Sequence, residues 1–267
     1  MFLSHINPVL VKLGLFEIRY YGLIYALSIV ITYFFLAYLV KQRKINLAKT
    51  EIADMLFYGM IGAVVGARIF YILFYNLSYF LANPIKIFAV WEGGLSWHGG
   101  FTGVLIAGYI FCRVKKINFW EIADLAVIPV SACLMLGRIG NFMNSELYGR
   151  ITNLPWAVKF DTAEGFRHPS QLYESFKNLV IFSVLWNVKD RKLPKGVMFS
   201  LFLVMYSVFR FIIEFFRQPD AQLGFILGPL TMGQLLNIPV FLAGIFLLVY
   251  FFKFHKSYKP KKIKKVK

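Results

Sequence analysis

The sequence predicts an all-α polytopic membrane protein with about seven transmembrane helices. Hydrophobic residues make up 58% of the 267 residues, whereas soluble domains contain about 45–50%, and the mean hydropathy is +0.62. The excess lies in long runs, and about 20 apolar residues are enough to cross about 30 Å of hydrocarbon. We therefore expect a single membrane domain over residues 1–267.

Seven segments are apolar enough to be predicted as membrane spans. In chain order they are Tyr21–Val40, Met55–Phe74, Leu95–Phe111, Ile122–Leu136, Leu172–Val188, Val197–Phe216 and Met232–Phe254. The fifth is the weakest of these predictions because it contains Glu174 and Lys177. Residues 1–19 lack the basic start and short apolar core of a cleavable signal peptide, so the first span is expected to be retained.

The basic residues predict the orientation of these spans. If the N-terminus lies outside, then the loops at 41–49, 113–116 and 189–195 and the tail at 255–267 lie in the cytoplasm. These segments contain most of the lysines and arginines, as expected for cytoplasmic loops. The C-terminus is therefore predicted to be cytoplasmic. Its lysine-rich tail is expected either to lie on anionic lipid headgroups or to be solvated.

Two of the predicted external segments are more than simple loops. Residues 77–100 contain two tryptophans, two Gly-Gly pairs and apolar runs that are too short to span. This pattern indicates a partly inserted or interfacial segment. Residues 138–170 are polar enough to form a small external head, with turns at Pro155-Trp156 and His168-Pro169.

Composition and motifs exclude several functions. The formal net charge is +17, but the positive residues flank apolar runs and no nucleic-acid-binding motif occurs, so nucleic acid is not an expected partner. Cys112 and Cys133 lie in apolar segments without a CxxC spacing, which indicates packing rather than a disulfide or a metal site. GxSxG, HExxH and P-loop motifs do not occur in the sequence. The nucleophile of any reaction is therefore expected to come from a substrate.

The sixth predicted span carries charges that a bilayer disfavours. Arg210 and Glu214 are four residues apart and share a helix face, with Tyr206 one turn earlier. A charged group at a helix centre costs at least about 2.5–3.5 kcal/mol. Two interpretations stay open here. The residues form either a structural ion pair between helices or an anion site in which Glu214 holds Arg210.

The fourth predicted span ends in a polar run from Gly137 to Arg150. It contains two arginines, two asparagines, one glutamate and three glycines. Glycine allows close approach of backbone to a ligand, and arginine matches the geometry of phosphate oxygens. A capped helix end would explain the glycines and asparagines, but it explains poorly so many donors beside an apolar helix. The run therefore favours a phosphate-binding site.

Two histidines are candidates for different roles. His98 is flanked by Gly99 and Gly100 and is suited to proton transfer, although an isolated interfacial histidine is more often structural. His168 precedes Ser170 and Glu174, which resemble an N-cap and a first-turn acidic residue. A structural role is the favoured interpretation for this second histidine.

Arg68, within the second predicted span, and Tyr21, at the start of the first, could be structural or functional. Arg68 follows Gly62 and Gly66, whose spacing suits close helix packing, and its side chain is expected either to snorkel outward or to line a site. Tyr21 opens the first span, where an aromatic belt residue is the default interpretation.

Four motifs together resemble a known family. They are Tyr20-Tyr21-Gly22, His98-Gly99-Gly100, the run Gly137–Gly149, and Tyr206–Arg217 followed by Gln218-Pro219-Asp220. In this order and with seven spans, the chain resembles the bacterial phosphatidylglycerol–prolipoprotein diacylglyceryl transferases from about Pro8 to Tyr250. Phe101-Thr102 departs from the family pattern, which more often has an apolar pair with glycines there.

The resemblance implies a reaction and a set of site residues. Such enzymes transfer diacylglycerol from phosphatidylglycerol to the lipobox cysteine of a prolipoprotein, which forms a thioether and releases glycerol phosphate. Resemblance assigns phosphatidylglycerol binding to Arg138, Asn141, Glu146 and Gly149. It assigns catalytic roles to Tyr21, His98, Tyr206, Arg210 and Glu214, with His98 as the candidate general base.

The resemblance also implies the setting of the reaction. The protein would be a multi-pass protein of the bacterial plasma (inner) membrane, with phosphatidylglycerol, prolipoprotein signal peptides and membrane lipids as partners. No metal or organic cofactor is implied. Two rivals are a multi-pass lipid or small-molecule carrier, which predicts inverted repeats that the sequence lacks, and a non-catalytic assembly scaffold.

Overall fold

The computed structural model describes residues 1–4, 6–13, 16–219, 225–228 and 230–254. The chain is mostly helical (70%) and divides into two compact units. The first unit comprises Met1–Thr32 and Trp120–Lys267, and the second comprises Tyr33–Phe119. The predicted basic tail at 255–267 and Asp220 of the fourth motif lie outside the described residues.

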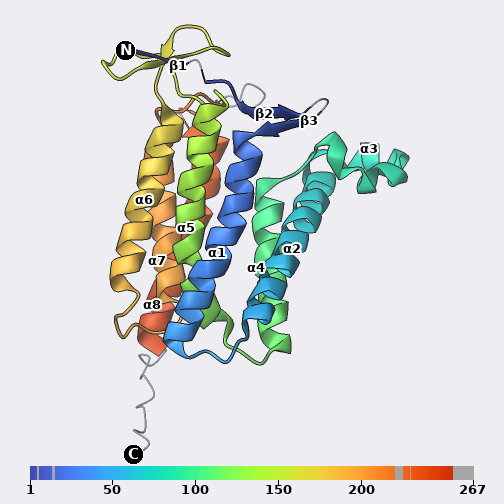
Figure 1. The fold of residues 1–267 in the computed structure, drawn as a ribbon, viewed down its shortest axis with the longest axis vertical. Helices are drawn as coiled ribbons and strands as arrows, with labels where there is room; N and C mark the ends of the chain where they lie inside the picture. Colours follow the sequence, from blue (N-terminus) through green and yellow to red (C-terminus); the bar gives the residue numbers. More distant parts are fainter. Residues whose placement is uncertain (5, 14–15, 220–224, 229, 255–267) are drawn as a thin grey trace, which may run out of the picture. The chain divides into compact units, whose positions relative to one another are not determined.

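The predicted spans fall on helices (Figure 1). The first unit contains the start of α1 (Tyr20–Arg43), nearly all of α5 (Phe119–Met143), and α6 (Ser170–Val188), α7 (Val197–Glu214) and α8 (Met232–Phe254). The second unit contains the rest of α1, α2 (Lys49–Tyr75), α3 (Leu77–Ala82), two 3-10 turns at Pro84–Phe88 and Val90–Glu92, and α4 (Trp97–Val114).

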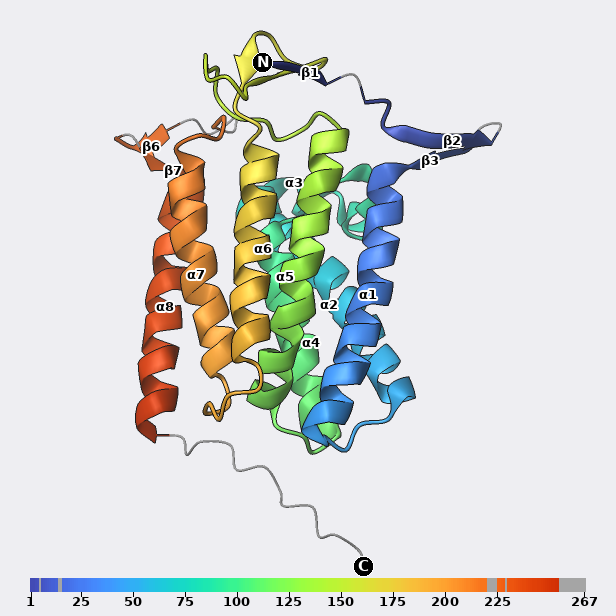
Figure 2. The same cartoon turned by 60° about the vertical axis from the view of Figure 1, so that its left-hand side comes forward.

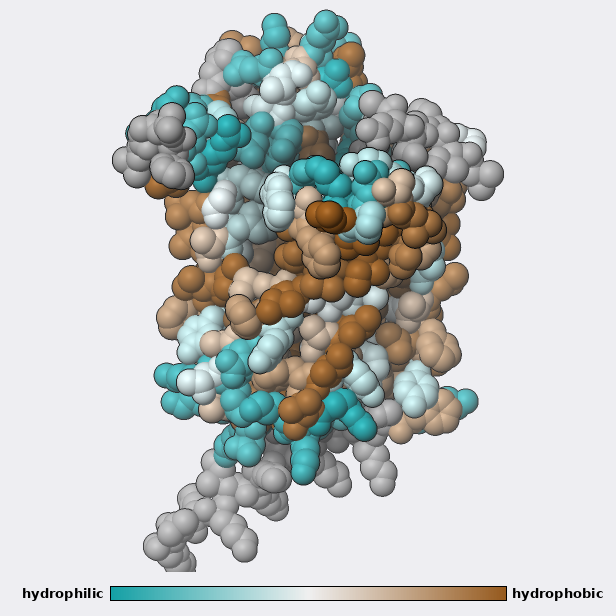
Figure 3. Space-filling model, turned by 90° about the vertical axis from the view of Figure 1, so that its right-hand side faces the viewer, coloured by the Kyte–Doolittle hydropathy of each residue, from teal (hydrophilic) through white to brown (hydrophobic). Residues whose placement is uncertain are grey.

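Five of the described helices are long and apolar enough to cross a membrane: α1, α2, α5, α7 and α8. Helices α4 and α6 coincide with predicted spans but do not meet the same criteria of length and composition. The protein is therefore membrane-embedded. That the chain crosses the membrane seven times stays a prediction. On the face that carries α2 and α4, apolar residues gather between hydrophilic ones (Figure 3).

Short strands correct the prediction of a purely helical fold. In the first unit, β1 (Phe2–Ser4) pairs in parallel with β4 (Val158–Phe160), which pairs antiparallel with β5 (Phe166–Arg167). Two antiparallel pairs flank helices, β2 (Val9–Leu13) with β3 (Phe16–Arg19) and β6 (Phe225–Leu227) with β7 (Leu230–Thr231). Strands of this length are too short for a period of two to show in the sequence.

The start of α7 is fixed by a carboxylate from another helix. Asp124 of α5 accepts backbone hydrogen bonds from Gly196 (2.7 Å) and Phe199 (2.8 Å). These N–H groups have no partner within α7, and the positive end of the helix dipole favours a carboxylate there. Helices α6, α7 and α8 then run side by side (Figure 2). Asp124 thus fixes where α7 begins and, with it, the positions of the charged residues on this helix.

In the second unit, α2 and α4 pack through glycines. A Cβ added at Gly62 would lie 2.6 Å from the carbonyl oxygen of Gly103, and one added at Gly66 would lie 2.9 Å from the Gly103 Cα. Gly99 meets Gly66 in the same way. Such small residues let two helix backbones approach closely. The packing role predicted for Gly62 and Gly66 is therefore confirmed.

Candidate active site

Helix α6 buries polar side chains and exposes apolar ones. Gln171, Glu174 and Lys177 are each at most 2% exposed, whereas Phe176 is 67% and Leu179 42% exposed. In water this arrangement would be unfavourable, because burial of charge costs free energy and burial of apolar surface gains it. It suits a helix whose outer face meets lipid and whose inner face lines a polar site.

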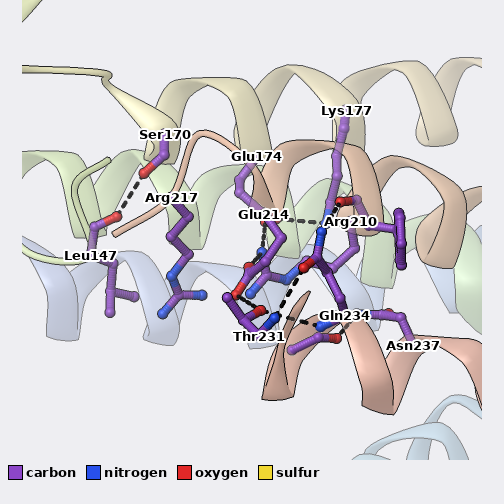
Figure 4. A network of polar contacts seen from close by, with 12 residues as sticks. Leu147, Ser170, Glu174, Lys177, Arg210, Glu214, Arg217, Thr231, Gln234 and Asn237 are labelled. Atoms are coloured by element: carbon purple, nitrogen blue, oxygen red, sulfur yellow. Dashed lines mark hydrogen bonds and ion pairs between the residues drawn. The ribbon is translucent and has the colours of Figure 1, made fainter. Parts of the chain in front are cut away.

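Glu174 lies at the centre of this polar site (Figure 4). Its carboxylate forms ion pairs with Lys177 Nζ (2.6 Å), Arg210 Nη1 (3.1 Å) and Arg138 Nε (3.8 Å). These cations come from three helices, α5, α6 and α7. The sequence predicted Glu174 as a first-turn residue of the helix, and Glu174 and Lys177 together made the fifth span the weakest prediction. The structure shows instead that both belong to a buried charge cluster.

Arg210 is held from a second side by Glu214, one helical turn later on α7. The two side chains form an ion pair, as predicted. Glu214 also accepts a hydrogen bond from the Thr231 hydroxyl at 2.8 Å. Thr231 in turn is tied to Gln234, whose backbone N–H donates to its hydroxyl at 3.4 Å. The Arg210 guanidinium is therefore fixed by two carboxylates, one of which is anchored to the start of α8 (Figure 4).

Tyr206 lies beside the same cluster. The Lys177 ammonium sits 4.0 Å from the centre of the Tyr206 ring, which is a cation–π contact. Tyr206, Arg210 and Glu214 follow at intervals of four on α7, so they share one face. The expectation that these three residues lie together is confirmed.

The cluster carries a surplus of positive charge. Among the described residues, Arg138, Lys177 and Arg210 face the two carboxylates of Glu174 and Glu214, which leaves one net positive charge. An unbalanced charge among apolar helices is costly, and such groups usually mark binding or catalytic sites. The geometry therefore favours an anion as the missing partner.

The polar run after Gly137 continues α5 before it turns. Asn141 donates to the Glu146 carboxylate at 2.7 Å, and the Glu146 carbonyl accepts from Gln171 of α6 at 2.6 Å. Gly140 lies against Tyr21, where an added Cβ would be 3.2 Å from the ring. The first unit thus brings Tyr21, Asn141 and Glu146 together at the end of α5.

The Tyr21 hydroxyl is positioned by a neighbour on the same helix. It lies 2.8 Å from the hydroxyl of Tyr25, one turn further along α1. The default interpretation of Tyr21 as an aromatic belt residue does not account for this arrangement or for its contact with Gly140. The side chain faces the polar run of α5.

Gly149 occupies a tight backbone position. Its N–H donates to the His168 carbonyl at 2.8 Å, and an added Cβ would lie 2.6 Å from the His168 Cβ. It also forms an isolated β-bridge with Arg217. Two nearby residues, Ser145 and Leu147, have positive φ of 53° and 57°, which is uncommon outside glycine. Contacts with His168, just before α6, and with Arg217, just after α7, hold this turn in place.

The structure corrects the predicted start of α6. The N-cap is Pro169, and no side chain caps the helix. Ser170 instead donates its hydroxyl hydrogen bond to the Leu147 carbonyl at 2.9 Å. His168 has a structural environment, with its Nδ1 3.1 Å from the Tyr173 hydroxyl. Burial lowers the pKa of His168, which favours the neutral ring.

The second unit contains His98 and Arg68. His98 lies in the first turn of α4, after Ser96, which accepts a hydrogen bond from the Gly99 N–H at 3.5 Å. Arg68 is 6% exposed and donates five hydrogen bonds to the backbone carbonyls of Lys86, Ile87, Ala89, Gly93 and Gly94. Both predictions for Arg68, snorkelling and lining a site, are therefore wrong. Its guanidinium holds the irregular segment between α3 and α4 in place.

No group of three or more His, Cys, Asp or Glu side chains with metal-binding geometry occurs in the described part of the chain. Cys112 and Cys133 are both free thiols. Cys133 donates to the Ser28 carbonyl at 3.2 Å and joins α5 to α1. The candidate site is thus built from arginine, lysine, carboxylate and tyrosine side chains.

The fold and the site define a membrane-embedded protein with a buried cationic cluster at its candidate site. Residues 8–250 match the prolipoprotein diacylglyceryl transferase family. A phosphatidylglycerol–prolipoprotein diacylglyceryl transferase of Geobacter sulfurreducens is 49% identical over 247 residues, which cover 92% of this chain and 95% of the relative. Proteins of the same name from Desulfotalea psychrophila and Rickettsia typhi are 41% identical (96% and 96% coverage) and 42% identical (93% and 98% coverage). The chain belongs to this family.

Proposed function

We propose that the protein transfers the diacylglyceryl group of phosphatidylglycerol to the cysteine thiol of prolipoproteins, the first step in their maturation. Family membership and the names of the relatives support this transferase activity. The observation that carries the proposal is the net positive charge of the cluster around Glu174. A phosphodiester carries one negative charge and would balance it.

The proposed step is a substitution at the glycerol carbon that bears the phosphate. The thiolate sulfur forms a bond to this carbon, and the carbon–oxygen bond to the phosphate breaks. The electron pair leaves with the phosphate oxygen, so the products are a thioether and glycerol phosphate. Charge on the phosphate grows during this step, and fixed arginines in a water-poor site stabilise such a change strongly.

Arg138 and Arg210 are the proposed phosphate ligands. Arg210 is held by Glu174 and Glu214, whereas Arg138 contacts Glu174 only at 3.8 Å. A long ion pair of this kind can yield to a ligand with little loss. We therefore assign the first contact with the lipid phosphate to Arg138 and the stabilisation of the leaving phosphate to Arg210.

His98 is the proposed general base. A free thiol has a pKa near 8.5 and must lose its proton to attack, and a neutral imidazole accepts a proton near neutral pH. In His98→Gln, turnover is expected to fall far more than phospholipid affinity. If turnover and phospholipid affinity fell equally, His98 would act in lipid binding and not as the general base.

The remaining predicted residues are assigned to the walls of the site. Tyr206 lies against Lys177 within the cluster. Tyr21, Asn141 and Glu146 are proposed to contact the glycerol part of the headgroup, since they supply hydroxyl, amide and carboxylate groups. Gly149 keeps the turn after α5 compact.

The proposal includes the membrane topology. Seven spans would place the N-terminus and a small head (about residues 138–170) outside and the C-terminus in the cytoplasm. The basic loops support this orientation. The site at the outer ends of α5, α6 and α7 would then open toward the leaflet in which the substrates lie.

The activity can be tested with purified protein in detergent. The substrates are phosphatidylglycerol and a lipobox peptide with one cysteine, and mass spectrometry detects the diacylglyceryl adduct. We expect an adduct with wild type and with Arg191→Ala, an exposed loop arginine, and none with a folded Arg138→Ala variant. Absence of an adduct with wild type, under conditions where an active relative forms one, would overturn the transferase proposal.

A further inference from the structure

Lys177 is a buried lysine to which the proposed mechanism gives no role. It lies on α6, is 2% exposed and has its ammonium 2.6 Å from Glu174 Oε2 and 4.0 Å from the Tyr206 ring centre. Burial of an ammonium in a membrane helix is costly, and such residues are retained where they act on a site. A role for Lys177 in a binding or catalytic site would explain why its charge is buried there.

Lys177 competes with the two arginines for one carboxylate. Lys177 and Arg138 both pair with Oε2 of Glu174, at 2.6 Å and 3.8 Å, while Arg210 pairs with Oε1 at 3.1 Å. The shortest of these contacts belongs to lysine. Arg138 is left with a long contact, made through Nε.

Lys177 also determines the charge of the cluster. Without it, Arg138 and Arg210 would face Glu174 and Glu214, and the cluster would be neutral. With it, one positive charge remains. Lys177 therefore pairs with Glu174 and also supplies the positive charge that an anion would balance.

We infer that Lys177 is a positioning residue of the phospholipid site, which occupies Glu174 and so keeps Arg138 and one surplus positive charge available to an anionic phosphodiester headgroup. This inference rests on the proposed function. It extends that function because it assigns the selection of an anionic lipid to a lysine that does not itself contact the phosphate.

The test is a comparison of Michaelis constants for two substrates. In Lys177→Met, Arg138 is expected to close onto Glu174, so the KM for phosphatidylglycerol should rise about tenfold, the effect of one weakened ionic contact. The kcat and the KM for the lipobox peptide should change less than about threefold. Lys177→Arg keeps the charge and should restore the KM for phosphatidylglycerol.

The chain offers a matched control at the other end of the same helix. Lys189 is 8% exposed, pairs with Asp190 at 2.5 Å and lies 4.4 Å from the Trp186 ring centre. It therefore shares burial, a carboxylate and an aromatic ring with Lys177, but it lies at the other end of α6. Lys189→Met should leave the KM for phosphatidylglycerol unchanged. An equal rise in both variants would overturn the inference, because it would report helix stability only.

A double variant tests the charge balance itself. Glu174→Gln combined with Lys177→Met leaves two arginines and Glu214, which restores one surplus positive charge. Its KM for phosphatidylglycerol should fall back toward that of wild type. A KM that stays as high as in Lys177→Met would overturn the charge-balance argument.

Failure of the inference can be separated from failure of the proposed function. If wild type forms no adduct, the transferase proposal fails. Binding of phosphatidylglycerol in detergent micelles to wild type and Lys177→Met then tests the lysine directly. Weaker binding by the variant supports the role of Lys177, and equal binding overturns it.

Discussion

The two units each bury an arginine, and the two arginines are satisfied in opposite ways. Arg68 directs five hydrogen bonds to backbone carbonyls of one segment and holds that segment in place. Arg210 meets carboxylates in a cluster that retains one positive charge. A saturated arginine has nothing left for a ligand, whereas a cluster with surplus charge can bind an anion. Saturation of donors, rather than burial, distinguishes a structural cation from a binding cation.

The largest expected effect comes from removal of the carboxylate at the centre of the cluster. Glu174→Gln would leave three cations, two of them buried, facing one remaining carboxylate, and breaking a buried ion pair costs about 3–5 kcal/mol. Thermal unfolding in detergent should therefore show a strongly destabilised protein. Glu164→Gln, at an exposed glutamate, is the control and should unfold like wild type. Equal stability of both variants would contradict a buried cluster.

Loss of Arg210 should affect turnover more than any exposed arginine does. Arg210→Ala removes a fixed donor for the leaving phosphate, and loss of one such donor costs about 100-fold to 1,000-fold in rate. The measurement is the initial rate of adduct formation at saturating lipid, with Arg191→Ala beside it. A fall of less than about tenfold in a folded Arg210→Ala variant would make this residue structural, like Arg68.

The glycine contact of the second unit predicts a smaller loss. Gly66→Leu would force α2 and α4 apart, and overpacking costs about 1–3 kcal/mol. Gly59 lies on the same helix with nothing within 4 Å of an added Cβ, so Gly59→Leu is a matched control. The free energy of unfolding should fall only for Gly66→Leu. Similar values for both variants would argue against close packing of these helices.

The smallest expected effect concerns pH and the segment before α6. Burial holds the pKa of His168 below its ordinary value. The folded state therefore binds fewer protons than the unfolded state as pH falls through the unfolded pKa, about 6.5. Stability should drop slightly between pH 7.5 and pH 5.5, and less so in His168→Phe. The same pH dependence in both proteins would assign the effect to other groups.

The sequence predicted the positions of the long helices because apolar runs and their ends are local signals. It also predicted the Arg210–Glu214 pair and the packing of Gly62 and Gly66, since both follow from helical spacing. The role of Glu174 was not predicted, because its partners Arg138 and Arg210 come from other helices. Two charges in one weak span, Glu174 and Lys177, were the signal that could have indicated it.

Other features depended on contacts that sequence spacing does not contain. The pairing of β1 with β4 joins residues at the N-terminus to residues near 158. Arg68 appeared able to line a site, and only the carbonyls of 86–94 show that its donors are saturated. Long-range partners of this kind decide whether a charged residue is structural or functional.

A comparison of Arg138→Gln with Arg68→Gln tests directly whether the Glu174 cluster is the anion site. Binding of phosphatidylglycerol and thermal unfolding are measured for both in the same detergent. We expect Arg138→Gln to lose phosphatidylglycerol affinity by at least about tenfold with a nearly unchanged Tm, and Arg68→Gln to lower the Tm while the folded protein still binds the lipid. Wild-type affinity in Arg138→Gln would contradict the assignment of the Glu174 cluster as the anion site.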